Sequence, residues 1–108
     1  MRWIVDGMNV IGSRPDGWWR DRDAAMARLV DQLERFAAET GDDVTVVFER
    51  KPRPPLKSTV IEIARRVEAD PKPASIQVVT SDRWLADRVS QAGATVLGSD
   101  GFRSRLEP

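Results

Sequence analysis

The sequence predicts an α/β domain whose β-sheet is mostly parallel. Short apolar or β-branched runs alternate along the 108 residues with segments of helical periodicity. Two of these runs end on an aspartate, a pattern expected where strand ends meet at one ligand-binding edge of an open sheet. Together, the alternation and the strand-end acids favour strand–helix–strand units joined by crossovers.

Each element follows from a local pattern. Strands are expected over residues 2–5, 44–48, 58–64, 76–80 and 94–97. Glycine and proline predict a loop over 12–23. Helical periodicity and terminal glycines predict a helix from Met26 to a cap at Gly41, a second from Leu85 to Gly93, and a closing turn over 102–106.

The connection between the third and fourth predicted strands is too short. Residues 65–71 cannot supply the crossover of about a dozen residues that parallel neighbours need. Either these strands are joined unusually, or residues are missing from the sequence after Ala64.

Composition excludes several classes of function. The chain has no cysteine and no histidine, which excludes thiolate chemistry, cysteine-based metal sites, serine triads and histidine acid–base catalysis. Its 17 basic and 17 acidic residues balance, so nucleic-acid binding would need a local patch. The length fits one domain over 1–108. No membrane-spanning run is present and the first strand starts too early for a signal peptide, so we expect a cytoplasmic protein.

The strand-end acids are the strongest candidates for chemistry. Asp6 and Asn9 follow the first strand, and Asp82 follows the fourth. Oxygen ligands without histidine or cysteine suit a hard cation such as Mg²⁺ or Mn²⁺. Alternatively, Asp6 and Asn9 form a local turn and Asp82 caps the following helix.

Two further acids are open to two interpretations. Asp87 is either an additional metal ligand or a surface partner of Arg83 or Arg88. Glu49 is either a third strand-end ligand or a partner of Arg50.

A basic stretch and a tryptophan pair are candidates for nucleic-acid binding. Arginine suits phosphate geometry, and exposed aromatic rings stack on bases. The basic candidates are Arg50, Lys51, Arg53 and Lys57. Trp18 and Trp19 cannot easily both face inward, and Trp18 is taken as the stacking candidate. The alternatives are solvated charge and core packing.

The motifs VDGMNVIG, FER, VVTSDRWLADRV and AGATVLG resemble the YacP-like branch of the NYN domains, which are PIN-like ribonucleases. The resemblance spans nearly the whole chain. It implies a Rossmann-like three-layer sandwich and divalent-cation-dependent RNA cleavage by clustered acids. Asp6, Asn9 and Asp82 match the family's motifs, and Asp87 is a weaker match.

One family feature is absent. The family carries an acidic pair, often A-D-D-x-I, at the start of the helix before the TSD strand. Arg65 and Arg66 resemble the continuation of that helix, yet no acidic pair precedes them. This difference also suggested that residues are missing after Ala64.

The leading hypothesis is a metal-dependent endoribonuclease. Asp6 and Asp82 would hold one or two Mg²⁺ or Mn²⁺ ions, and Asn9 would orient a ligand or substrate oxygen. The alternative is a non-catalytic module of the same fold that binds RNA or the ribosome. An aspartyl-nucleophile phosphohydrolase is disfavoured, because Met8 stands where such enzymes place a second aspartate. A structural domain with incidental strand-end acids is the remaining interpretation.

Overall fold

The computed structural model describes residues 1–14, 16–49 and 58–107. The strands are β1 (Arg2–Asp6), β2 (Asp43–Val47), β3 (Ile76–Val79) and β4 (Thr95–Leu97). The helices are α1 (Gly7–Gly12), α2 (Arg22–Thr40), α3 (Ser58–Ala69), α4 (Arg83–Gln91) and α5 (Ser99–Leu106), with 3₁₀ turns η1 (Trp18–Arg20) and η2 (Pro73–Ser75). Within these ranges, no helix combines the length and apolar character needed to cross a bilayer.

The described strands form one parallel sheet in the order β2-β1-β3-β4. The first strand is an inner strand and pairs on both sides, so that Val5 lies opposite Val46 of β2 and Val79 of β3. Because all four strands are parallel, their carboxyl ends lie at one edge. This arrangement confirms the predicted α/β class.

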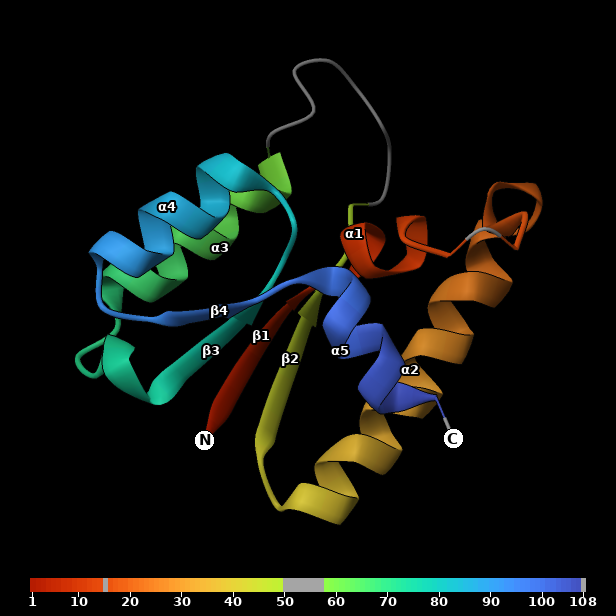
Figure 1. Cartoon of the computed structure of the whole chain (residues 1–108), viewed down its shortest axis with the longest axis horizontal. Helices are drawn as coiled ribbons and strands as arrows, with labels where there is room; N and C mark the ends of the chain where they lie inside the picture. Colours follow the sequence, from red (N-terminus) through yellow and green to blue (C-terminus); the bar gives the residue numbers. More distant parts are fainter. Residues whose placement is uncertain (15, 50–57, 108) are drawn as a thin grey trace.

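The sheet is covered on both faces, as a three-layer sandwich requires. Helices α2 and α5 lie on one side, and α3 and α4 lie on the other (Figure 1). Alternate residues of β1 contribute to the two cores: Trp3 packs with Phe36 and Phe102, whereas Ile4 belongs to the cluster that contains Ile63. The Rossmann-like architecture implied by the family resemblance is therefore present.

The prediction of a strand over 58–64 was wrong, because this segment is the first part of α3. Its β-branched residues favour a strand locally, but the buried Thr59, Ile63 and Val67 are spaced four residues apart, which places them on one face of a helix. The helix continues through Ala64 without a break and is itself the crossover from β2 to β3. The topological reason for expecting missing residues therefore disappears.

Other predicted elements are present with shifted boundaries. The long helix starts at Arg22, where the Asp21 carboxylate accepts a hydrogen bond from the Ala24 amide at 3.0 Å. It ends at Gly41, which has a left-handed φ of 73°. The short helix α1 was not predicted. It begins at Gly7, where a Cβ would lie only 2.5 Å from the Phe48 ring, so a larger residue would not fit without rearrangement.

Two isoleucine variants test the helical assignment of α3. A strand would place Ile61 and Ile63 on the same face, whereas the helix exposes 37% of Ile61 and buries Ile63 completely. We expect Ile63→Ala to lower the free energy of unfolding by about 2–5 kcal/mol. We expect Ile61→Ala to lower it by less than about 1 kcal/mol. Urea denaturation measures both, and equal losses would contradict the helix.

Candidate functional site

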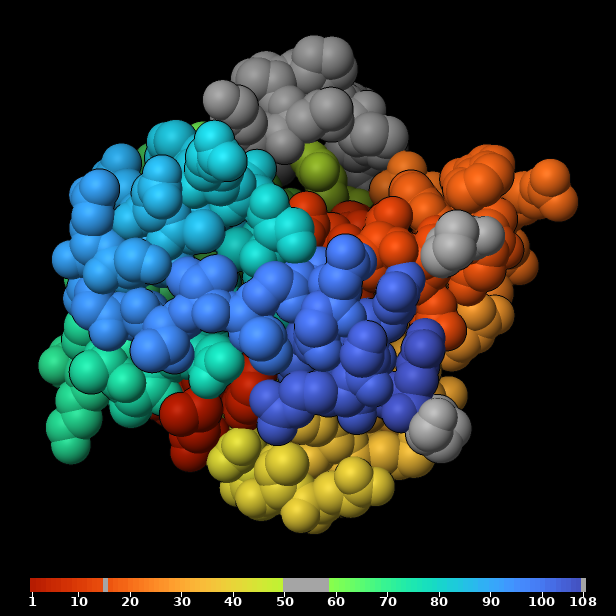
Figure 2. Space-filling model, viewed as in Figure 1, coloured from red at the N-terminus to blue at the C-terminus, as the bar shows by residue number. Residues whose placement is uncertain are grey.

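The candidate site lies at the carboxyl edge of the sheet, where β1 and β3 end. From β1 the chain continues to β2 on one side, and β3 pairs with β1 on the other side. The direction of the strand order therefore reverses at β1. Open α/β sheets bind ligands at such a switch point. A cavity of about 240 Å³ opens here. Its lining comprises Asp6, Met8, Asn9, Glu49, Thr59, Val60 and Asp82. The space-filling view shows the red segment around α1 beside the cyan segment that joins β3 to α4 (Figure 2).

Asp6 is a buried carboxylate with no ion-pair partner in the described part of the chain. Only 5% of the residue is exposed. The Thr80 hydroxyl donates a hydrogen bond to its Oδ2 atom at 3.0 Å. Burial raises the pKa of Asp6, and the negative charges of Asp82 and Glu49 add to the increase, whereas the hydrogen bond from Thr80 opposes it. A bound cation would relieve this unfavourable charge.

Asn9 joins three segments at the edge. Its Oδ1 atom accepts hydrogen bonds from the Ser81 backbone amide at 2.8 Å and from the Ser99 hydroxyl at 2.5 Å. Because a backbone amide can only donate, the side-chain oxygen must face Ser81. Asn9 therefore fixes α1 against the turn after β3 and the start of α5, and its NH₂ group makes no hydrogen bond to the described residues.

Asp82 is the N-cap of α4, so the capping interpretation is confirmed for this residue. Its Oδ1 atom accepts from the Leu85 amide at 2.8 Å, and its own amide donates to the Thr80 hydroxyl at 3.1 Å. The cap engages one carboxylate oxygen. The other makes no hydrogen bond to the described residues, so Asp82 can cap the helix and also face a ligand in the cavity.

The structure brings together some predicted residues and not others. Asp6, Asn9 and Asp82 share the cavity, and Glu49 lines it as well. Asp87 is exposed on α4 and does not line the cavity.

Among the residues predicted to contact nucleic acid, only the two tryptophans lie within the described part of the chain. Trp18 is half-buried against the core, and Trp19 is the more accessible ring, with 59% of the residue exposed. The rings form an edge-to-face pair with centroids 6.1 Å apart. Arg50, Lys51, Arg53 and Lys57 lie outside the described residues.

The start of α3 carries hydroxyl residues where the family resemblance implies acids. Ser58 and Thr59 open this helix, and the buried Thr59 lines the cavity. Within residues 1–14, 16–49 and 58–107, no group of three or more acidic side chains is close enough together to hold a metal. The donor set closest to a cation site is therefore the pair of carboxylates from Asp6 and Asp82.

Sequence reasoning missed the hydroxyl residues that support this site. Thr80 reaches Asp6 across 74 positions of sequence, and Ser99 reaches Asn9 across 90. No local pattern links such distant residues. Thr59 had a usable signal, the four-residue spacing with Ile63 and Val67, but the segment was interpreted as a strand.

Comparison with known proteins concerns the fold. No family model matches the sequence, and no curated protein matches it. The fold matches that of Rae1 (YacP) from Bacillus subtilis. The similarity to the crystal structure of a mutant of that protein has a TM-score of 0.78 and covers 98% of this chain and 74% of the other, at 20% sequence identity. At this identity the likeness establishes a shared architecture.

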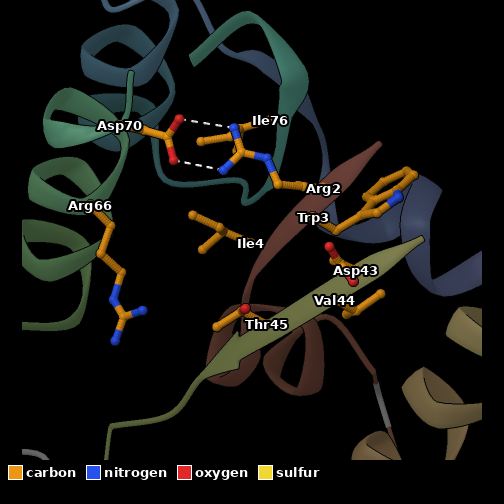
Figure 3. Close-up of a pocket in the computed structure, with 9 residues that line it drawn as sticks. All are labelled: Arg2, Trp3, Ile4, Asp43, Val44, Thr45, Arg66, Asp70 and Ile76. Carbon is orange, nitrogen blue, oxygen red and sulfur yellow. Dashed lines mark hydrogen bonds and ion pairs between the residues drawn. The ribbon is translucent and has the colours of Figure 1, made fainter. Parts of the chain in front are cut away.

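A second cavity, of about 580 Å³, lies toward the amino ends of the strands (Figure 3). Here the Arg2 guanidinium donates two hydrogen bonds to Asp70, at 2.6 and 2.9 Å, and one to the Lys72 carbonyl at 3.0 Å. The hydrogen bonds from Arg2 lower the pKa of Asp70 to about 2. This pair ties the start of β1 to the end of α3, and its charges are satisfied internally, so we assign it a structural role.

The Arg2–Asp70 pair predicts a specific acid sensitivity. The pKa of Asp70 is lowered from 3.8 to about 2, so its stabilising effect is full above about pH 4 and is lost as the pH falls toward 2. We expect Asp70→Asn to be less stable at neutral pH and to show a flatter dependence of unfolding free energy on pH across that interval. Asp31→Asn, at an exposed position of α2 without a described ion pair, is the control. Identical pH profiles for Asp70→Asn and the parent protein would contradict this role.

Proposed function

We propose that this protein is a divalent-metal-dependent endoribonuclease that cleaves RNA at the carboxyl edge of its sheet. The observation that carries the proposal is the pairing of Asp6 and Asp82 in one cavity at the switch point of the sheet. Asp6 is buried there without a cationic side chain beside it in the described part of the chain. Such a carboxylate is costly to the fold unless it binds a positively charged group.

The donor atoms suit Mg²⁺ or Mn²⁺. Magnesium is commonly held by one or two carboxylates, with phosphate oxygens of the substrate and water completing its shell. Asp6 and Asp82 would supply the two carboxylates. When bound, the ion would activate water and stabilise negative charge on the phosphate that is attacked.

The remaining residues position this pair. Thr80 donates to Asp6 and accepts from the Asp82 amide, so one hydroxyl links the two acids. Asn9 holds α1 in place and presents its NH₂ group as a donor for a phosphate oxygen. Glu49 adds negative charge at the cavity wall and is a candidate for a water-mediated contact to the ion.

A similarity of motifs and a similarity of fold support an RNA-related function. The sequence motifs resemble the YacP-like branch of PIN-like ribonucleases, and the structure matches a protein named YacP. RNA is therefore the proposed partner, with Arg50, Lys51, Arg53 and Lys57 as candidate phosphate contacts.

The second candidate is a non-catalytic RNA- or ribosome-binding module. One observation favours it: Thr59 stands at the start of α3, where the family resemblance implies acids, and the described acids do not form a group of three. This candidate predicts RNA binding that weakens with salt and does not depend on divalent metal.

Asparagine variants test the nuclease proposal without removing the supporting hydrogen bonds. Asparagine retains an acceptor for the Thr80 hydroxyl at position 6 and is a good N-cap at position 82. We expect Asp6→Asn and Asp82→Asn to reduce the rate of RNA cleavage at least about 100-fold while circular dichroism shows an intact fold. Excess EDTA should abolish parental cleavage, and added Mn²⁺ should restore it.

The matched control is Asp87→Asn, because Asp87 lies on the same helix as the Asp82 cap but outside the cavity. Its cleavage rate should stay close to the parental rate. Full activity of Asp6→Asn and Asp82→Asn, or full activity in EDTA, would refute the proposal. Metal-independent RNA binding without cleavage would favour the second candidate.

A further inference from the structure

Trp84 is an exposed aromatic residue next to the candidate site. It lies in the first turn of α4, two residues after Asp82, which lines the cavity. Its exposed fraction is 42%, whereas the neighbouring Leu85 is completely buried. The core therefore does not account for a tryptophan at this position, and its side chain is accessible to solvent beside the start of α4.

A cation restrains the orientation of this ring. The Arg88 guanidinium lies 5.6 Å from the centroid of the Trp84 ring, one helical turn further along α4. The Glu68 carboxylate of α3 accepts a hydrogen bond from Arg88 at 2.6 Å and holds it in place. A ring that is held in this way loses little freedom when a planar ligand stacks on it.

The charge around Trp84 suits a phosphodiester chain. Arg83 directly precedes Trp84, is exposed and makes no ion pair with the described residues, and Arg88 lies over the ring. Aromatic rings among arginines bind single-stranded nucleic acid, because bases stack on the rings and cations contact the backbone. The acidic cavity alone would repel a phosphate, so positive charge beside it is needed for RNA to approach.

We infer that Trp84 is a stacking platform for a base of single-stranded RNA, next to the phosphate that lies at Asp6 and Asp82. This inference rests on the proposed function and extends it to a substrate class. Bases in a duplex are stacked on one another and do not offer a free face, whereas an unpaired base can lie flat on the ring.

Fluorescence anisotropy with a short, unstructured, fluorescein-labelled oligoribonucleotide tests the inference. Every variant is made in the full chain that also carries Asp6→Asn, which prevents cleavage during the titration. We expect Trp84→Leu to raise the Kd about 5- to 150-fold, the range for loss of one stacked base. Trp84→Phe keeps an aromatic face and should bind within a few-fold of the parent.

Two controls separate stacking from general hydrophobic contact. Ile61 is another exposed apolar residue, on the adjacent helix α3, and Ile61→Ala should leave the Kd unchanged. A blunt RNA duplex should bind Trp84→Leu and the parent equally. The inference is overturned if Trp84→Leu binds the single strand within twofold of the parent, or if Ile61→Ala weakens binding as much, which would indicate a protein-type docking surface.

The outcomes for the two proposals are distinguishable. If Asp6→Asn and Asp82→Asn cleave like the parent but Trp84→Leu slows cleavage of the single strand, the metal-dependent mechanism fails and the stacking platform stands. If cleavage requires both acids but Trp84→Leu neither weakens single-strand binding nor slows cleavage, the nuclease stands and the platform fails.

Discussion

The fold and its site both depend on parallel pairing of β1 with a neighbour on each side. Its alternate residues supply two cores, with Trp3 and Val5 on one face and Ile4 on the other. The same pairing places the end of β1 beside the end of β3, so Asp6 comes within hydrogen-bond distance of Thr80. Shifting β1 by one residue would exchange its core faces and remove Asp6 from this edge.

The buried carboxylate of Asp6 lowers the stability of the fold, and contacts elsewhere in the molecule must compensate for this loss. Asp6 is buried, carries a raised pKa and shares its cavity with two other acids. At the opposite end of the sheet, the Arg2–Asp70 pair shows how this fold satisfies a carboxylate that has only a structural task. Asp6, by contrast, has no ion pair within the described residues, and the proposed metal site rests on this difference.

The sequence predicted what depends on local pattern. The strands that end at Asp6 and before Asp82 were identified because apolar runs stop abruptly at polar residues. The start of α3 was misassigned because its four β-branched residues outweighed the helical period, which becomes visible only when Val67 is included. The hydrogen bond from Ser99 to Asn9 could not be predicted, because it depends on how α5 folds back over the sheet edge.

The central claim is that Asp6 and Asp82 bind one divalent cation between them. The most direct measurement is a Mg²⁺ titration at neutral pH, followed through the ¹³C resonances of the side-chain carboxyl groups. The account predicts that the Asp6 and Asp82 resonances shift together and saturate with one Kd, while that of Asp70, paired with Arg2, stays in place. A shift of only one of the two acids, or a small unsaturated drift shared with Asp70, would contradict it.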